Sequence, residues 1–302
     1  MGHFDGQVAV VTGAGGGLGR EYALLLAAQG AKVVVNDYGG DTTGTPGTPA
    51  MAEAVASEIL EAGGVAVADG HDVATGGTDV ITTALEAFGA VHIVINNAGI
   101  AGGGTFDAIS PDDFDRMLAI HLGGTLAVSR AAWPVFGSQD YGRIVNTSSA
   151  SVFGLPGTSA YITAKAAVFG LTRALGHDGR GIGVKVNAVM PSAFSRLTSQ
   201  SPELGPVMSA GFPAKRAAPF VCALATRSVV CTGETFVVGG GRAARVVLGT
   251  VPGLREISSI DDCLARFDEA LSLDGLYVPE DAIHEVLYEC QEIGLDLSSF
   301  SS

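Results

Sequence analysis

Residues 8–37 constrain the fold of this chain more than any other stretch. They read VAVVTGAGGGLGREYALLLAAQGAKVVVND: a short apolar strand, a glycine-rich turn, an amphipathic helix that stops at Gly30, a second apolar strand and an acid, Asp37. Such a unit is a parallel pair of strands joined by a helical crossover. Glycines at the start of the helix let a diphosphate approach backbone N–H groups at the positive end of the helix dipole. The stretch therefore predicts a dinucleotide-binding site.

The acid that ends the second strand also suits a dinucleotide. Asp37 follows the last glycine of the turn, Gly19, by 18 residues, close to where dinucleotide-binding folds place a carboxylate on the adenosine ribose. The turn has the form Thr-Gly-x-x-x-Gly-x-Gly and not G-x-G-x-x-G, because Leu18 stands where the third glycine of that pattern would be. The chain has 43 glycines, so a cluster of glycines is weak evidence by itself. The flanking strands, the helix and Asp37 are what indicate a dinucleotide-binding turn.

Length and charge favour one large domain followed by an acidic tail. The chain has 302 residues, of which 47% are hydrophobic, and strands alternate with helices about every 25 residues, as in α/β proteins. Residues 256–302 hold 12 acids and one base, so most of the net charge of −14 lies there and residues 1–255 carry a net charge of −3. We therefore expect a domain over residues 1–255 and an acidic helical extension over residues 256–302.

Composition also excludes several classes of partner. The nearly neutral domain has no basic stripe of the kind that binds nucleic acid. The sequence has no signal-peptide pattern and no uncharged apolar run long enough to span a bilayer, so we expect a soluble, cytoplasmic protein. Four widely spaced cysteines without a C-x-x-C pair predict free thiols, with no metal site and no disulfide framework.

A second group of residues points to chemistry at a hydroxyl group. The strand expected at residues 142–147 leads to Ser148 and Ser149, and the next helix carries Tyr161 and Lys165, which a spacing of four puts on one helical face. A free tyrosine, with a pKa near ~10, is a poor base at neutral pH, but a nearby ammonium favours its phenolate. Tyr161 is therefore a candidate acid/base with Lys165 as its partner. Either serine could polarise a carbonyl.

Together these motifs resemble the short-chain dehydrogenase/reductase family. The resemblance rests on the T-G-x-x-x-G-x-G turn, on Asn-Asn-Ala-Gly at residues 96–99 and on Y-x-x-x-K. It implies a Rossmann-type doubly wound parallel α/β sheet, a single domain with a C-terminal helical tail, and NAD-dependent oxidation or reduction at a CH–OH group. Aligning GRIVNTSS with the family pattern makes Ser149 the catalytic serine beside Tyr161 and Lys165. Counting back from the tyrosine favours Ser148 instead.

The resemblance also assigns the cofactor site residue by residue. Asp37 would accept hydrogen bonds from the ribose of NAD and repel the 2′-phosphate of NADP. An Asp-Val pair would border the adenine, and the Asn-Asn-Ala-Gly motif would form a wall of the site. The expected cofactor-binding residues are Gly13, Gly17, Leu18, Gly19, Asp37, Asp72, Val73, Asn97, Ala98, Gly99, Tyr161 and Lys165.

One position departs from the family pattern. His121 stands where most members have an asparagine, in N-x-x-G, that anchors a water and completes a proton relay. Two interpretations of His121 remain: it has a role specific to one branch of the family, or it is a buried histidine bonded to a backbone carbonyl.

A narrower resemblance covers most of residues 4–250. Phrases such as VVVNDYGGD and IHLGGTLAVSRAAW are similar to the (3R)-hydroxyacyl-CoA dehydrogenase module of peroxisomal multifunctional β-oxidation enzymes, also classed with 17β-hydroxysteroid dehydrogenases, and to bacterial homologues. It implies a 3-hydroxyacyl-CoA substrate, including one with a bulky or steroid-derived acyl group. A dehydrogenase of free hydroxysteroids or other secondary alcohols is the alternative enzyme. A dinucleotide-sensing module without turnover would not need Ser149, Tyr161 and Lys165 together.

Three expectations concern the parts around the site. Residues 192–219, rich in Ser, Pro and Gly, should form a lid over the substrate, and the tail should form two short acidic helices. The family pairs subunits through the helices that here hold residues 116–132 and 161–175, so we expect a homodimer or homotetramer. The apolar residues expected on their outer faces are Leu126, Val128, Phe169 and Leu171.

Overall fold

The computed structural model describes residues 2–40, 47–194 and 204–295. The chain forms two compact units, Met1–Arg245 and Val246–Ser302. A functional division at residue 255 stays a prediction.

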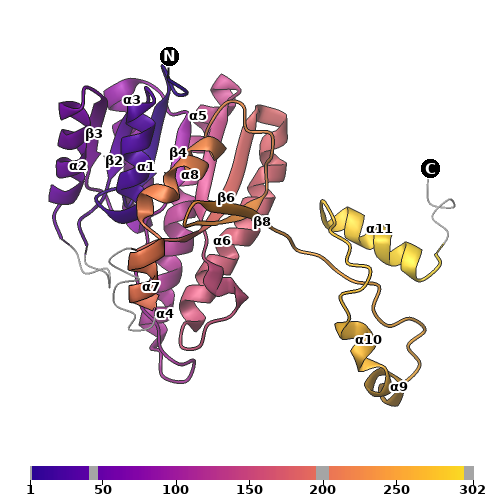
Figure 1. Ribbon diagram of the computed structural model, residues 1–302. Coiled ribbons are helices and arrows are strands. Elements are labelled where there is room, and N and C mark those ends of the chain that lie inside the picture. The colour runs from indigo at the N-terminus through magenta and orange to yellow at the C-terminus, as the bar shows by residue number, and fades with distance from the viewer. Residues whose placement is uncertain (1, 41–46, 195–203, 296–302) are drawn as a thin grey trace. The chain divides into compact units, whose positions relative to one another are not determined.

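The first unit is built on a sheet whose strands, in the described residues, lie in the order β3-β2-β1-β4-β5-β6-β7-β8 (Figure 1). β1 pairs in parallel with β2 on one side and β4 on the other, so the order reverses there. Gly240 and Gly241 alone separate β7 from β8, which must therefore be antiparallel, because a parallel pair needs a longer crossover. The strands are β1 (Val8–Thr12), β2 (Lys32–Asn36), β3 (Val65–Asp69), β4 (Ile93–Asn96), β5 (Gly142–Thr147), β6 (Val184–Ser192), β7 (Thr235–Gly239) and β8 (Arg242–Val246). This is the predicted Rossmann-type sheet.

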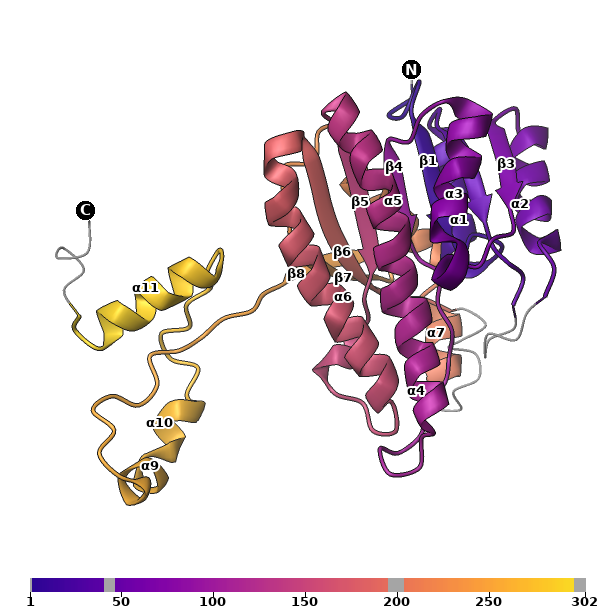
Figure 2. The ribbon, with the colours of Figure 1, turned by 180° about the vertical axis from the view of Figure 1, so that it is seen from behind.

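Helices cover both faces of the sheet (Figures 1 and 2). The residues of α1, α2 and α8 share one apolar core with the strands, and those of α3 and α5 share the other, with α6 beside α5. Their bounds are α1 (Gly17–Ala28), α2 (Ala50–Glu61), α3 (Val73–Phe88), α5 (Gly124–Gln139), α6 (Ser159–Asp178) and α8 (Ala218–Leu224). Alternate strand residues face opposite layers: Val11 packs in the first core and Val10 in the second. Continuous apolar strands such as VAVVT follow from this burial on both sides.

The helix predicted from residue 110 to about 132 is interrupted and longer. Ser110 caps α4 (Pro111–Leu118), its Oγ accepting the N–H of Asp113 at 3.1 Å. A five-residue π-helical segment, Ala119–Gly123, then leads into α5, which continues through Pro134 to Gln139. The helix continues past the proline. Phe136, two residues further on, is completely buried in the core.

The lid predicted over residues 192–219 is only partly described. Residues 195–203 lie outside the described residues. The rest includes α7 (Leu204–Gly211), a short 3-10 segment, Ala214–Arg216, and the start of α8.

The second unit has three short helices where two were predicted. They are α9 (Ile260–Ala265), α10 (Phe267–Leu271) and α11 (Ala282–Glu292). Residues 260–271 form two helices because the backbone leaves helical geometry at Arg266, which has φ −116° and ψ 16°. Thr250 and Tyr277 exchange two backbone hydrogen bonds, and the Tyr277 ring stacks on Tyr288 at 4.4 Å between centres. Within the described residues, neither unit has a helix with the length and apolar character needed to cross a membrane.

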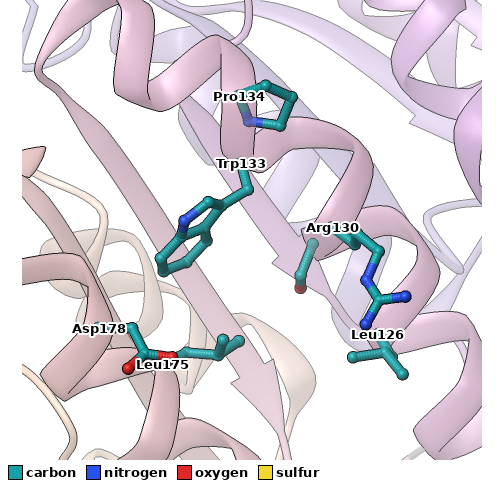
Figure 3. Close-up of a pocket in the computed structure, with 7 residues that line it drawn as sticks. Leu126, Arg130, Trp133, Pro134, Leu175 and Asp178 are labelled. Carbon is teal, nitrogen blue, oxygen red and sulfur yellow. The ribbon is translucent and has the colours of Figure 1, made fainter.

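A pocket of about 420 Å³ lies between α5 and α6 on the surface of the first unit (Figure 3). Leu126 and Trp133 from α5 and Leu175 from α6 supply apolar lining, while Arg130 and Asp178 add charge. Not all of the predicted outer face is exposed here: Val128 is fully buried against the sheet. The prediction for Val128 was wrong because its position on the helix faces the core and not the surface.

Candidate active site and cofactor site

The glycine turn is shaped by close backbone contacts. Gly13 has φ +62°, and a Cβ there would lie 2.8 Å from the Cα of Ala98. A Cβ on Gly19 would lie 2.2 Å from the carbonyl oxygen of Gly13. Both positions therefore require glycine, and their missing side chains leave the backbone bare in front of the first turn of α1.

Thr12 and Asn97 tie this turn to the end of β4. The Thr12 hydroxyl oxygen accepts the N–H groups of Asn97 and Ala98, each at 3.0 Å. In return, the side-chain Nδ2 of Asn97 donates to the carbonyl oxygens of Thr12 and Gly13, both at 3.1 Å. Asn97 thus acts through the backbone that it holds, and it brings Ala98 and Gly99 beside the turn.

A cavity opens between this turn and the ends of β2 and β3. Its lining includes predicted cofactor residues, namely Gly13, Asp37, Asp72, Val73, Ala98 and Gly99. It also includes Asn36, Tyr38 and His71, which were not among the predicted cofactor-binding residues. No pattern of spacing marks these three, since they meet only when β2 and β3 pair.

The two acids of this cavity have different partners. The carboxylate of Asp37 accepts the N–H of Gly15 at 3.0 Å and that of Gly39 at 2.8 Å, so it lies across the end of the glycine turn. The carboxylate of Asp72 caps α3 by accepting the N–H of Ala74 at 2.9 Å. A bare glycine backbone at a helix start, with an acid beside it, fits the diphosphate and ribose of a dinucleotide.

Tyr161 and Lys165 lie one turn apart on α6. The ammonium of Lys165 donates to the carbonyl oxygen of Thr147 at 2.7 Å and lies 5.8 Å from the centre of the Tyr161 ring. Lys165 is only 3% exposed, and this burial lowers its pKa to about 7. Burial also raises the pKa of Tyr161, and a hydrogen bond with Ser149 partly opposes that rise.

The two serines that the sequence left open have different surroundings. Ser148 is 1% exposed, and its hydroxyl donates to the backbone carbonyl of Lys165 at 2.9 Å. Ser149 is more accessible: its hydroxyl donates to Oγ of Ser151 at 3.1 Å and accepts the N–H of that residue, and its hydrogen bond with Tyr161 lowers the pKa of the phenol. Ser149, Tyr161 and Lys165 therefore lie together. The Ser148 hydroxyl instead bonds the backbone of α6 to the end of β5.

His121 is buried next to this group, in the π-helical segment. Its ring meets the Tyr161 ring edge to face, with centres 5.2 Å apart, and its Nε2 lies 3.0 Å from the carbonyl oxygen of Ile100. Burial lowers the pKa of His121 well below its usual value, and the charge of Lys165 lowers it further. The ring fills the space beside Gly99, where a Cβ would lie 2.4 Å from its Cε1. This is a neutral histidine bonded to a backbone group.

The described residues contain no cluster of three or more His, Cys, Asp or Glu side chains arranged to hold a metal ion. The hydroxyl of Ser149, the phenol of Tyr161 and the ammonium of Lys165 meet where β5 ends.

With this fold and site, the chain belongs to the short-chain dehydrogenase/reductase family. Residues 7–203 match the short chain dehydrogenase family. It is an oxidoreductase of a family that uses NAD or NADP.

Two relatives place it further within that family. A short-chain type dehydrogenase/reductase of Mycobacterium tuberculosis is 44% identical over 274 residues, covering 89% of this chain and 95% of that protein. Peroxisomal multifunctional enzyme type 2 of mouse is 42% identical over 239 residues, covering 79% of this chain but only 32% of that longer protein. The chain is thus homologous to the dehydrogenase part of the multifunctional enzymes, as the sequence predicted.

Two solved structures share the fold. A short chain dehydrogenase from Mycobacterium avium is 35% identical, with a TM-score of 0.78, and the match covers 92% of this chain and 98% of that one. A 7α-hydroxysteroid dehydrogenase, in complex with NADH and 7-oxoglycochenodeoxycholic acid, is 27% identical, with a TM-score of 0.71 and a coverage of 79% and 94%.

Proposed function

We propose that this protein is an NAD-dependent dehydrogenase that interconverts a secondary alcohol and a ketone, with 3-hydroxyacyl-CoA thioesters as its substrates. The observation that carries the proposal is the convergence of Ser149, Tyr161 and Lys165, with the His121 ring packed against both Tyr161 and Gly99. The acyl-CoA substrate rests on the similarity to peroxisomal multifunctional enzymes. A cytoplasmic location stays a prediction.

In the proposed mechanism, Tyr161 moves the proton. When bound, NAD supplies the acceptor for the hydride that leaves the carbon bearing the hydroxyl. Ser149 hydrogen-bonds the substrate oxygen and orients it, while the Tyr161 phenolate accepts the hydroxyl proton as the carbonyl forms. The ammonium of Lys165 favours that phenolate. In the reverse direction Tyr161 returns the proton, so both directions balance.

The proposed cofactor residues are those predicted from the sequence. Backbone N–H groups beside Gly17, Leu18 and Gly19 would hold the diphosphate, because they begin α1. Asp37 would accept hydrogen bonds from the adenosine ribose. Its carboxylate would repel a 2′-phosphate, which favours NAD over NADP.

An apolar substrate suits the exposed side chains near the site. Phe106, Phe153 and Leu155 are exposed at 81%, 69% and 45% and follow the carboxyl ends of β4 and β5. The N–H of Gly104 donates to the carbonyl oxygen of Gly157 at 2.9 Å, which joins these two segments. They would contact an acyl chain. They would equally contact a sterol, and the similarity to a hydroxysteroid dehydrogenase supports free hydroxysteroids as the second candidate.

A homodimer or homotetramer forms part of the proposal. The apolar pocket between α5 and α6 would be covered by the same face of a second subunit, since closed symmetric pairs use one surface twice.

The test is turnover by the Tyr161→Phe variant. NADH formation is measured with 3-hydroxyacyl-CoA thioesters and with free hydroxysteroids, and NAD binding is measured by calorimetry. We expect kcat to fall by about a thousandfold or more with NAD affinity nearly unchanged, because the ring stays and the proton acceptor is lost.

The matched control is Tyr141→Phe. Tyr141 immediately precedes β5, and its hydroxyl accepts a hydrogen bond from Gln7 at 2.9 Å, so this variant also loses one phenol hydroxyl. It should keep normal turnover. If Tyr161→Phe kept more than about a tenth of the wild-type kcat, Tyr161 would not be the acid/base.

A further inference from the structure

A buried carboxylate at the end of β3 holds a histidine in the cofactor cavity. Asp69 is 4% exposed, and its Oδ1 accepts Nδ2 of Asn36 at 2.6 Å and the N–H of His71 at 3.2 Å. Its Oδ2 accepts the hydroxyl of Thr83 at 2.6 Å and lies 2.9 Å from Nδ1 of His71. Surrounded by donors, this carboxylate acts as an acceptor, so Nδ1 of His71 carries a proton.

The side chain of His71 is half exposed, and the residue lines the cofactor cavity. The side chain is 51% exposed, whereas its carboxylate partner is buried. The ring lines the same cavity as Asp37, Tyr38 and Asp72. The backbone carbonyl of His71 also accepts Nδ2 of Asn36 at 2.9 Å, which fixes the segment next to Asp37. His71 therefore belongs to the wall that an adenosine group would meet.

We propose that His71 is a specificity-determining residue of the cofactor site: held by Asp69, it supplies a titratable positive charge that partly offsets Asp37 toward a 2′-phosphate. The inference rests on the proposed use of a dinucleotide. Its consequence is that discrimination against NADP weakens as His71 becomes charged.

The groups that face His71 are acidic. Asp69 lies on β3, Asp72 caps α3 and Asp79 lies on it, and Asp37 follows β2 in the wall of the same cavity. The hydrogen bond to Asp69 and the charges of Asp69 and Asp79 raise the pKa of His71, while partial burial lowers it less. The imidazolium is therefore present at and somewhat above the usual pH range of a histidine.

The experiment measures binding and needs no turnover. Dissociation constants of NAD and of NADP are measured by calorimetry at pH 6.0 and pH 8.5 for the wild type, His71→Gln and His177→Gln. His177 lies in the last turn of α6, away from the cavity, and serves as the matched control. The 2′-phosphate titrates near pH ~6 in every variant, so the comparison between variants isolates the contribution of His71.

We expect the ratio of the NADP to the NAD dissociation constant to fall on going from pH 8.5 to 6.0. The fall should be about fivefold larger in the wild type and His177→Gln than in His71→Gln. Equal pH dependence in all three would overturn the role of His71 and leave the proposed function intact. A protein that binds neither cofactor would overturn both.

A second measurement does not depend on the variant's folding. The chemical shift of the Cε1 proton of His71 is followed by NMR in the wild type as the pH changes. Without cofactor, the midpoint of this titration should lie above the usual pKa of about 6.5, and it should shift when NADP binds. A midpoint that NADP leaves unchanged would overturn the proposal.

Discussion

Replacing Lys165 by methionine should stabilise the protein while abolishing its activity. Lys165 is almost completely buried, and burial lowers its pKa from 10.5 to about 7. Since one pKa unit corresponds to about 1.4 kcal/mol, holding this ammonium in the folded protein costs about 5 kcal/mol at low pH. Methionine loses the hydrogen bond to the Thr147 carbonyl, worth about 1 kcal/mol. The net gain below pH 7 should be about 3 to 4 kcal/mol.

The gain must depend on pH in one direction. Below pH 7 Lys165 is charged in both the folded and the unfolded chain, so the full cost is present. Between pH 7 and 10.5 the unfolded chain binds more protons, and the stability of the wild type rises with pH. The cost of burying the charge should therefore fall to about 2 kcal/mol at pH 9. After the loss of the hydrogen bond this leaves Lys165→Met an advantage of about 1 kcal/mol, which should vanish near pH ~10.

Urea denaturation without cofactor measures this difference. Wild type and variant are compared at pH 6.5 and 9.5, at one protein concentration because the proposed assembly makes stability concentration-dependent. The control is Lys185→Met: the Lys185 ammonium also donates to a backbone carbonyl, that of Val229, but the side chain is partly exposed. It should give no gain. A stability difference for Lys165→Met that is the same at both pH values would refute the reasoning.

Three further predictions follow from the site and the surface. Ser149→Ala should lower kcat by about a hundredfold, whereas Ser148→Ala should lose about 1 kcal/mol of stability with normal kcat; the reverse pattern in steady-state kinetics and denaturation would make Ser148 the catalytic serine. The wild type should favour NAD over NADP by roughly a hundredfold in kcat/KM, and Asp37→Ala should reduce that ratio; a wild-type ratio below about ten would mean that Asp37 does not govern the choice. Leu126→Asp should convert an oligomer into monomers in light scattering at micromolar concentration; a wild-type monomer would rule out the proposed assembly.

Much of the fold could be predicted because local pattern and burial agree. The strand predicted at residues 142–147 matches β5, whose first five residues are buried and which is followed by two serines. β8, by contrast, is an edge strand with mostly exposed residues. Its sequence, RAARV, lacks an apolar period because little of it is buried.

The site was harder to predict where function depends on pairing between strands. Asn36 and His71 lie 35 residues apart, and the β2–β3 register, which pairs Asn36 with Asp69, brings Asn36 to both Asp69 and His71. The orientation of Ser148 and Ser149 likewise depends on how α6 sits against β5, which spacing alone does not give. Tyr161 and Lys165, in contrast, lie on one helix, so their shared face could be read from the sequence.

The close contact between Gly99 and His121 restricts the order in which these two positions could be substituted. A methyl group on residue 99 would lie 2.4 Å from the His121 ring, closer than carbon atoms pack in proteins. Alanine at position 99 is therefore accessible only after position 121 has become smaller, whereas a smaller residue at position 121 needs no prior change. While His121 is present, residue 99 in the wall of the predicted cofactor site cannot carry a side chain.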